Sequence, residues 1–388
     1  MAIKIKQFIQ PFSDFVRTNV TGGFLLLFCV VISLIAVNTS FYDTFHHFFN
    51  TEVGISVAGK SFNRDIHFWI NDGLMAIFFL LVGLEIKREL LEGELSDIKK
   101  SSLPIMSAIG GMIVPAIVYT AFNFNTHGQN GWAIPMATDI AFAVAIISLL
   151  GNRVPLSLKI FLTALAIVDD LGAIVVIAIF YTQSLSLTYI FYAFSVLIIL
   201  YLLNISRVKS LSIYIPFGIL LWYFIYKSGI HATISGVLFA FMIPTNKGNH
   251  ISPLEKLEHL LNKPVAYFIM PLFALSNTDI ILSTGIFQSL SQPIGLGIIS
   301  GLVFGKVTGI VAFAYLSIKL KLSSLPSGTN WKHLFGAGFL GGIGFTMSIF
   351  IALLSFPEIE YQALSKLAIL LASVCSGAIG YLVLRNSK

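Results

Sequence analysis

Long apolar segments follow one another along almost the whole chain, separated by short polar stretches. Most contain close to the roughly 20 residues that a helix needs to cross the hydrocarbon of a bilayer. Backbone polar groups in lipid must be satisfied internally, so these segments are expected to be helices unless they line a cavity. The segments, with ends placed to within a few residues, are 20–37, 66–86, 102–122, 132–150, 157–180, 188–204, 211–226, 230–243, 264–282, 293–318, 333–355 and 364–384.

Composition supports the bilayer as the solvent for residues 1–388. Hydrophobic residues make up 56% of the chain and charged residues 11%, against roughly 25% charged residues in soluble domains. Cys29 and Cys375 both lie in apolar stretches, where packing rather than a disulfide or metal is expected. We therefore predict an all-α integral membrane protein with about 12 transmembrane helices in a single domain, the first of them an uncleaved span.

The basic residues give an independent indication of topology. With the N-terminus placed inside, most of the 24 lysines and arginines fall in the termini and the inside loops. The outside loops carry Lys60, Arg64, Lys227 and Lys366. This bias predicts a multi-pass membrane protein with both termini cytoplasmic. Because the net charge of +6 is scattered over short loops, it argues against a nucleic-acid partner.

Two loops stand out by length. The outside loop 38–65 contains the stretch 53–63, which reads as two short strands around Ala58-Gly59. A lone hairpin is only marginally stable in water. It could pair with the hairpin of a second copy and give a homodimer, or it could be a mobile loop. The second loop, 244–263, is expected on the cytoplasmic side.

Four acidic residues lie well inside expected spans, namely Asp72, Asp139, Asp169 and Asp170. Each ionised group at mid-membrane costs roughly 2.5–3.5 kcal/mol on insertion scales, so such groups must be paired, hydrated or protonated. Carboxylates are hard oxygen ligands that suit Na⁺ or Li⁺. They also bind protons, and a group that holds either a proton or a cation can exchange the two across a membrane.

Lys306 is the one basic residue deep inside an expected span, and it needs a carboxylate partner there. The candidates are Asp169 and Asp170, followed by Asp139; the alternative is snorkelling to the interface. Asp169 and Asp170 are successive residues of a helix, so their side chains diverge by about 100° and cannot form one symmetric dyad.

Two expected spans carry helix-breaking residues. Pro135 interrupts segment 4 beside Asp139, and the glycine-rich stretch 336–344 interrupts segment 11. These segments are the middle members of segments 3–5 and 10–12, which run in opposite directions. Interrupted helices at matching places in two halves indicate inverted repeats with a transport site between them.

Several motifs resemble the NhaA sodium/proton antiporters of bacteria. They are Ile70-Asn-Asp-Gly-Leu-Met75, Val82-Gly-Leu-Glu-Ile-Lys-Arg-Glu-Leu90, Ala137-Thr-Asp-Ile-Ala-Phe142, Ala164-Leu-Ala-Ile-Val-Asp-Asp-Leu-Gly-Ala173, Lys227-Ser-Gly-Ile-His-Ala-Thr233 and Gly342-Ile-Gly-Phe-Thr-Met-Ser-Ile349. The resemblance implies an electrogenic Na⁺(Li⁺)/H⁺ antiporter that needs no cofactor and serves pH homeostasis and salt tolerance. The 53–63 hairpin matches the family's dimer contact.

The resemblance also implies roles for individual residues. Asp170 would bind the cation, and Asp169 would share that role or pair with Lys306. Thr138 would be an auxiliary ligand, and Asp139 and Lys306 would offset the charges of the broken-helix ends. The residues matching the family's pH response are Glu85, Arg88, Glu89, His231, Glu258 and His259.

Other functions with buried aspartates fit less well. An intramembrane aspartyl protease needs two aspartates on separate helices, with a Gly-x-Gly-Asp setting that is absent. In a channel, adjacent deep carboxylates would hold cations too tightly for rapid passage. A sodium-coupled organic-anion symporter of the same fold remains the alternative.

Overall fold

The computed structural model describes the chain except residues 1, 58–59, 183–184, 246–251 and 388. The described part is mostly helical, with one two-stranded antiparallel sheet. It divides into two compact units, and each is described by itself. Unit 1 comprises residues 1–27, 92–173 and 280–388, and unit 2 comprises 28–91 and 174–279.

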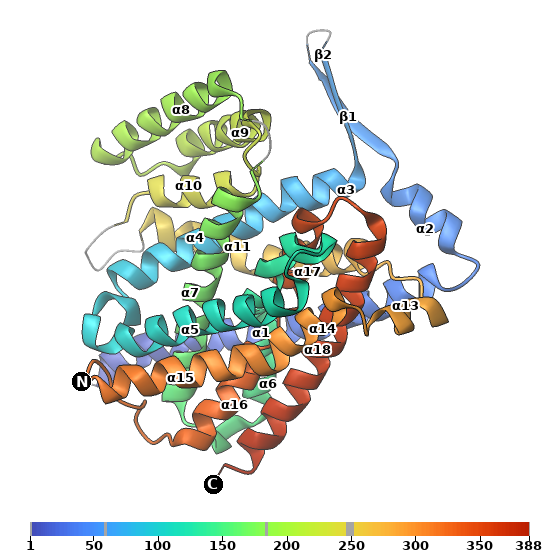
Figure 1. Cartoon of the computed structure of the whole chain (residues 1–388). Helices are drawn as coiled ribbons and strands as arrows, with labels where there is room; N and C mark the ends of the chain where they lie inside the picture. The colour runs from blue at the N-terminus through green and yellow to red at the C-terminus, as the bar shows by residue number, and fades with distance from the viewer. Residues whose placement is uncertain (1, 58–59, 183–184, 246–251, 388) are drawn as a thin grey trace. The chain divides into compact units, whose positions relative to one another are not determined.

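Unit 1 contains the two stretches in which inverted repeats are expected (Figure 1). Its elements are α5 (Ile98–Asn123), α6 (Ile140–Leu149), α13 (Thr284–Ser289), α14 (Pro293–Ser300), α15 (Lys306–Lys319), α16 (Trp331–Gly341), α17 (Phe345–Ser355) and α18 (Ile359–Arg385), with 3-10 helices Glu94–Ser96, His127–Met136 and Gly151–Arg153 and a π-helical turn Gly301–Gly305. Helices α1 (Ala2–Val37) and α7 (Leu156–Phe180) contribute residues to both units.

The helices that open the two stretches pack closely on each other within unit 1. Helices α5 and α15 run side by side and meet at Gly110 and Gly309 (Figure 1). A Cβ added to either glycine would overlap the carbonyl oxygen of the other. Glycine at both positions therefore allows the two backbones to touch, as is common between helices in membranes.

Unit 2 holds the hairpin and the helices that follow it in sequence. Its elements are α2 (Tyr42–Phe49), β1 (Glu52–Val57), β2 (Lys60–Asp65), α3 (Ile66–Phe68), α4 (Met75–Leu91), α8 (Leu187–Ile205), α9 (Leu211–Ser228), α10 (Ile234–Met242), α11 (Pro253–Pro264) and α12 (Met270–Asn277), with π-helical turns Trp69–Leu74 and Val265–Ile269. The strands pair from Glu52 opposite Asp65 to Val57 opposite Lys60. The expected turn at Ala58-Gly59 and most of the loop 244–251 lie outside the described residues.

Eight to ten of the expected spans are recognisable in the described helices. Eight helical stretches are long and apolar enough to cross a membrane, and the number is ten if each of two bent pairs is counted as one span. The expected span 230–243 corresponds to the nine-residue α10, and the expected span 264–282 overlaps the end of α11, the π-helical turn Val265–Ile269 and α12. The all-α membrane class is consistent with these helices, and the count of twelve stays a prediction.

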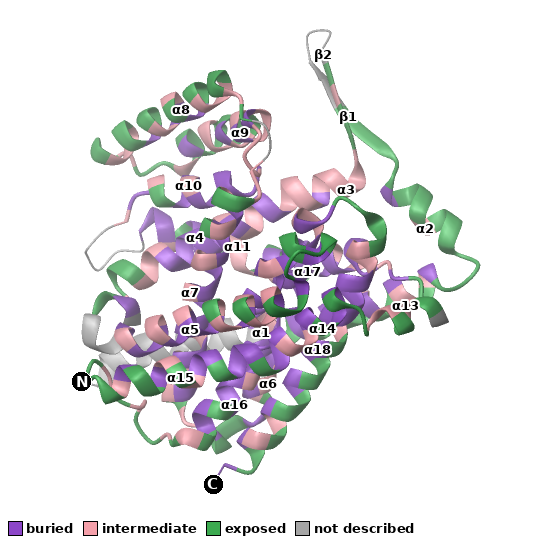
Figure 2. Cartoon of the chain, in the orientation of Figure 1, coloured by how far each residue is buried: buried purple, intermediate pink, exposed green. Residues whose placement is uncertain are grey.

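Apolar side chains on the outside of these helices indicate lipid rather than water as their surroundings. Helix α8 is largely exposed and helix α9 partly exposed in Figure 2, and their exposed residues include Phe191, Phe194, Leu202 and Ile219. An apolar surface of this size is costly in water. The two helices are each long enough to span a bilayer.

Candidate functional site: two broken helices and a buried charge cluster

Both helix breaks expected from the sequence are present in unit 1. Segment 4 is a 3-10 helix, His127–Met136, followed by extended residues up to Asp139 and then α6. Segment 11 is α16 followed, after residues 342–344, by α17. Each pair bends by 44°. Pro135 cannot donate a backbone hydrogen bond and glycines weaken a helix, which explains why the breaks occur there.

The two breaks contact each other directly. The backbone N–H of Asp139 donates to the Ile343 carbonyl at 2.6 Å. The Ser348 hydroxyl donates to the Ile134 carbonyl at 2.7 Å. Unwound backbone leaves polar groups without helical partners, and these groups must be satisfied where no water reaches them. Each break therefore supplies part of the hydrogen bonding that the other has lost.

Asp139 bridges the first turns of two helices. Its Oδ1 accepts the backbone N–H of Phe142 in α6, and its Oδ2 accepts the backbone N–H of Thr346 in α17, each at 3.1 Å. The Thr346 hydroxyl also donates to Oδ2 at 2.5 Å. A helix N-terminus carries a partial positive charge, so one carboxylate here is stabilised by two helix ends.

Lys306 and Asp169 form a fully buried ion pair. The ammonium Nζ lies 2.7 Å from Asp169 Oδ2, and both side chains are 0% exposed. Lys306 also donates to the carbonyl of Met136, the last residue of the 3-10 helix. A cation is favourable at the carboxyl end of a helical segment, and Lys306 lies at such an end. Asp139 is the counterpart, a negative group at the amino ends of α6 and α17.

The π-helical turn Gly301–Gly305 immediately precedes Lys306. A π turn adds a residue to the helix and shifts the register of the residues after it, and such turns are frequent at functional sites. Here it sets the rotation of α15 at which Lys306 faces Met136 and Asp169.

Thr138 has two acceptors for one hydroxyl hydrogen. Its Oγ1 lies 2.7 Å from Asp169 Oδ2 and 2.7 Å from the carbonyl oxygen of Gly341, the last residue of α16. A hydroxyl donates one hydrogen bond. Donation to an ionised Asp169 therefore excludes donation to Gly341, whereas a protonated Asp169 could itself donate to Thr138.

Asp169 and Asp170 are both buried in α7. Lys306 and Thr138 contact Asp169 Oδ2. The other oxygen of Asp169, Oδ1, is buried without a hydrogen-bond partner among the described residues. Within the described part of the chain, no group of three or more His, Cys, Asp and Glu side chains could hold a metal ion. A hard cation at these aspartates would thus draw on hydroxyl or carbonyl oxygens as well.

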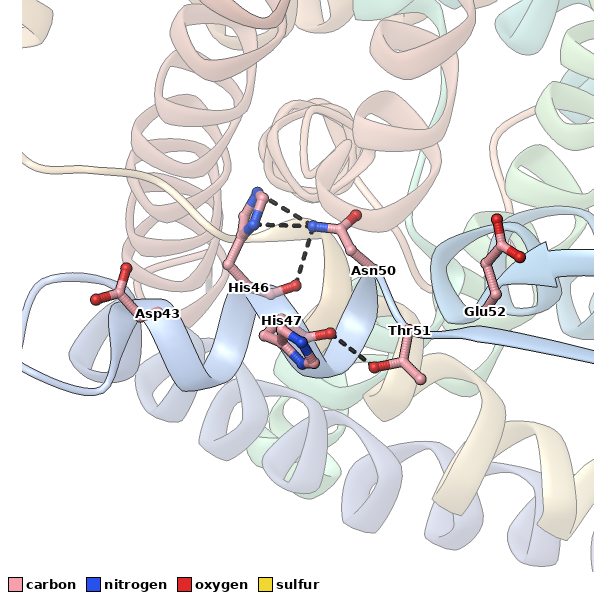
Figure 3. Close-up of a pocket in the computed structure, with 6 residues that line it drawn as sticks. All are labelled: Asp43, His46, His47, Asn50, Thr51 and Glu52. Atoms are coloured by element: carbon pink, nitrogen blue, oxygen red, sulfur yellow. Dashed lines mark hydrogen bonds between the residues drawn. The ribbon is translucent and has the colours of Figure 1, made fainter.

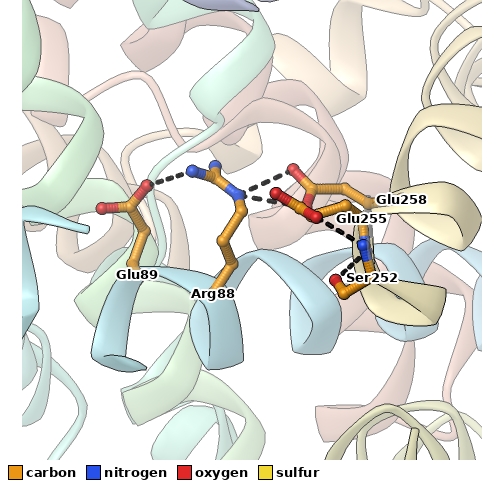
Figure 4. A network of polar contacts seen from close by, with 5 residues as sticks. All are labelled: Arg88, Glu89, Ser252, Glu255 and Glu258. Carbon is orange, nitrogen blue, oxygen red and sulfur yellow. Dashed lines mark hydrogen bonds and ion pairs between the residues drawn. The ribbon is translucent and has the colours of Figure 1, made fainter. Parts of the chain in front are cut away.

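In unit 2 the residues expected to respond to pH form two separate groups. Arg88, near the end of α4, contacts Glu89 at 3.0 Å and Glu258 of α11 at 3.0 Å (Figure 4). Glu85 is buried in the same helix and His259 is exposed. Glu255 beside Glu258 closes a capping box with Ser252 that fixes the start of α11.

Burial and charge act in opposite directions on Glu258. Burial raises the pKa of this carboxyl above its usual value, and the neighbouring Arg88 lowers it; the net direction is upward. His231 is not part of this cluster. Its Nδ1 lies 3.6 Å from Asp72 Oδ1 instead, an ion pair when the histidine is protonated. The indole N–H of Trp222 donates to the Asp72 carbonyl.

A recess in unit 2 is lined by polar residues that are all exposed (Figure 3). Its hydrogen bonds are local ones, such as those from Asn50 to the His46 carbonyl and from Thr51 to the His47 carbonyl. It contains none of the buried aspartates, so we assign it no role.

Thr346 and Ser348 belong to this site, although no role for them was predicted from sequence. Both lie within a motif recognised from the sequence, but a hydroxyl residue in an apolar helix often bonds its own preceding turn. They follow directly after a glycine-rich break, where backbone donors and acceptors lack helical partners. This position in the sequence is the feature from which their role could have been predicted.

These features define a multi-pass membrane protein with buried ionisable groups at two helix breaks that contact each other, an arrangement typical of secondary transporters. Comparison with known proteins narrows the class. The family model for "Na+/H+ antiporter 1" matches residues 13–384, so the chain belongs to that family and is a secondary transporter rather than an enzyme.

Several curated relatives cover nearly the whole chain. "Na(+)/H(+) antiporter NhaA 2" of Flavobacterium johnsoniae is 54% identical over 97% of this chain and 93% of its own length. "Na(+)/H(+) antiporter NhaA" of Flavobacterium psychrophilum is 49% identical over 96% of this chain and 95% of its own. The protein of the same name from Citrobacter koseri is 46% identical over 96% and 97%.

Proposed function

We propose that this protein exchanges Na⁺ or Li⁺ for protons by letting both compete for Asp169 and Asp170. The observation that carries the proposal is the pair of buried carboxylates in α7 next to two helix breaks that contact each other. A buried carboxylate is costly when ionised and uncompensated, so it is occupied by either a proton or a cation. The names of the relatives favour sodium/proton antiport over organic-anion symport.

The contacts support different roles for Asp169 and Asp170. Lys306 Nζ lies 2.7 Å from Asp169 Oδ2, which supports Asp169 as the partner of the lysine. In the proposed cycle Asp170 binds the cation, and Thr138 supplies an auxiliary oxygen. The Asp169–Lys306 pair carries a second proton. More than one proton per Na⁺ then makes the exchange electrogenic.

The inverted-repeat arrangement is part of the proposal. The close approach of Gly110 and Gly309 joins the first helices of the two stretches, and the breaks of the second helices meet at Asp139 and Ile343. These matched contacts support a pseudo-two-fold relation between segments 3–5 and 10–12.

We further propose regulation by pH and assembly as a homodimer in the bacterial inner membrane, with both termini cytoplasmic. The Arg88–Glu258 contact supports a titratable connection between α4 and α11. Strands β1 and β2 leave two edges without partners among the described residues, and such edges can pair with another chain.

Exchange in everted membrane vesicles tests the proposed function. Addition of Na⁺ or Li⁺, but not K⁺, should dissipate a preset pH gradient, and Asp170→Asn should abolish the response. Asp43→Asn is a matched control, because this carboxylate is exposed in α2. Equal responses from wild type and Asp170→Asn, at equal protein levels, would overturn the proposal.

A further inference from the structure

Aromatic side chains from α9 and from the turn that follows the hairpin stack on one another in unit 2. The indole of Trp222 stacks on both Trp69 and Tyr226, with ring centroids 6.1 Å apart in each pair. Trp222 and Tyr226 are four residues apart, so they lie on one face of α9. The indole N–H of Trp69 donates to the Val53 carbonyl in β1, and that of Trp222 donates to the Asp72 carbonyl. The stack therefore connects β1, the π-helical turn that contains Trp69, and α9.

Strand β2 adds two side chains to this stack. Phe62 and Arg64 are two residues apart in the strand, so they point to the same face of the hairpin. The ring of Phe62 meets the ring of Tyr226 edge to face, with centroids 5.8 Å apart. The guanidinium of Arg64 donates from Nε and Nη2 to the Tyr226 hydroxyl and lies 5.6 Å from the centre of the Phe68 ring. One face of the strand pair is thereby held against α9.

A second cation contacts the same rings. Lys227 Nζ lies 5.6 Å from the centre of the Tyr226 ring and 6.0 Å from that of Phe62. Cations over aromatic faces are attracted by the ring quadrupole. These seven residues are called the hairpin anchor below: Phe62, Arg64, Phe68, Trp69, Trp222, Tyr226 and Lys227.

The opposite face of the hairpin is covered from within. Gly54 pairs with Asn63 across the two strands, and a Cβ added to Gly54 would lie 1.9 Å from Asn63 Oδ1. The Asn63 side chain therefore lies over the glycine. A further strand would then join the hairpin at a backbone edge rather than at a face. Two identical edges related by a two-fold axis can pair antiparallel with each other, so a second copy of this chain fits there.

We propose that the hairpin anchor is a determinant of dimer assembly, because it holds the strand pair in the orientation in which its edge pairs with the hairpin of a second copy. The inference rests on the homodimer proposed above and adds residues outside the strands to the contact. A lone hairpin is only marginally stable in water. Ordering it during association would cost conformational entropy and weaken binding, and an edge that is held beforehand avoids this cost. Tyr226 is the central residue, since it contacts both strand side chains and both cations or rings of α9 beside it.

The test compares Tyr226→Leu with Tyr226→Phe in the full-length protein. Leucine removes the ring and the hydroxyl, whereas phenylalanine keeps the ring and loses the acceptor of Arg64. Sedimentation of a dilution series in detergent measures the dissociation constant of the dimer. We expect Tyr226→Leu to raise this constant about tenfold or more and Tyr226→Phe to raise it a few-fold. Exchange of Na⁺ for protons should stay close to wild type, because Asp169 and Asp170 belong to unit 1.

Tyr214→Phe is the matched control. Tyr214 lies on the same helix, and its hydroxyl donates to the Val208 carbonyl near the opposite end of α9. Its loss should lower thermal stability without changing dimer dissociation. A double-variant cycle adds a second check. Tyr226→Phe should have no further effect in an Arg64→Gln background, because both changes remove the same hydrogen bonds.

Hydrogen exchange of the backbone amides of β1 and β2 reads the anchor without the partner. At a dilution where both proteins are monomeric, these amides should exchange about tenfold faster in Tyr226→Leu than in wild type, and Tyr214→Phe should match wild type. If leucine prevents folding, Arg64→Gln takes its place. Both a weaker dimer and a faster-exchanging hairpin are required, and either one without the other would overturn the inference.

Replacement of residues 53–64 by a short linker separates the two ways in which the inference can fail. If that protein is a monomer while Tyr226→Leu dimerises like wild type, the hairpin joins the two copies and the anchor is not needed for it. If that protein is still a dimer, the contact lies elsewhere, and the proposed dimer falls together with the inference. Neither result bears on exchange at Asp170.

Discussion

Lys306 Nζ lies 2.7 Å from Asp169 Oδ2 within unit 1, and neither side chain is exposed. A buried ion pair of this kind is costly to desolvate, but removal of one partner leaves a charge with no compensation. The pair therefore has two consequences. It stabilises the packing of α15 against the first helix break. It also pairs Asp169, one of the two adjacent aspartates of α7, with a cation of the protein itself.

Removal of Lys306 should destabilise the protein strongly. We expect Lys306→Gln to lower the free energy of unfolding by about 3–5 kcal/mol, because it leaves Asp169 buried without its cation. The double variant Lys306→Gln/Asp169→Asn should recover much of this loss. Thermal unfolding in detergent measures both; a double variant no more stable than Lys306→Gln would argue against the pairing.

At position 138, loss of the hydroxyl should affect exchange more than a change in the size of the side chain. Thr138→Ser keeps the single hydrogen that Asp169 and Gly341 compete for, and should retain exchange within a few-fold of wild type. Thr138→Val leaves both acceptors without that donor, which costs about 1–3 kcal/mol for a buried group. It should raise the apparent KM for Na⁺ about tenfold or more. Equal KM values for the serine and valine variants would contradict this use of the hydroxyl.

How much of this site can be predicted from sequence depends on the residue. The breaks were predictable because Pro135 and the glycines around 341 weaken a helix wherever they occur. The apolar pattern left both Asp169 and Asp170 open as the partner of Lys306, because the two differ by about 100° on their helix and the pattern does not fix its rotation. The resemblance gave pairing with Asp169 as one possibility. The π turn Gly301–Gly305 changes the helical register just before Lys306, and no residue pattern in the sequence predicts this turn.

Contacts between residues distant in the chain were the least predictable. The resemblance tied His231 to the pH response without indicating a partner, and the structure places it against Asp72. Thr346 lies 207 residues from Asp139, and only the folded chain brings the two together. The helical membrane class could be predicted from composition, since it depends on totals rather than on individual contacts.

Glu258 should make stability depend on pH. Burial raises its pKa from the ordinary 4.5, so the folded state holds the proton to higher pH than the unfolded state does. Stability is then greatest below the ordinary pKa and falls as pH rises through the raised one. Glu258→Gln should flatten this part of the curve of unfolding temperature against pH. Arg88→Gln should steepen it, because the arginine favours the ionised carboxyl. A wild-type curve that rises over this range would refute an upward shift of the Glu258 pKa.

The β1–β2 hairpin should determine oligomeric state. Replacement of residues 53–64 by a short Gly-Ser linker removes the unpaired strand edges, and we expect a monomer that still exchanges Na⁺ for protons. Light scattering coupled to size-exclusion chromatography measures the mass in detergent. Substitution of the exposed Leu187 in α8 by alanine is a control that should leave the mass unchanged. A shortened protein with the same mass per particle as an intact dimer would place the contact elsewhere.

Competition between Na⁺ and protons for the same buried carboxylates is tested most directly by proton release on ion binding. Purified protein in weak buffer, at a pH where these groups are partly protonated, should release protons when Na⁺ is added, and K⁺ should release none. Asp170→Asn should abolish the release while the protein remains folded. Sodium binding by wild type without proton release, or undiminished release from Asp170→Asn, would contradict the mechanism.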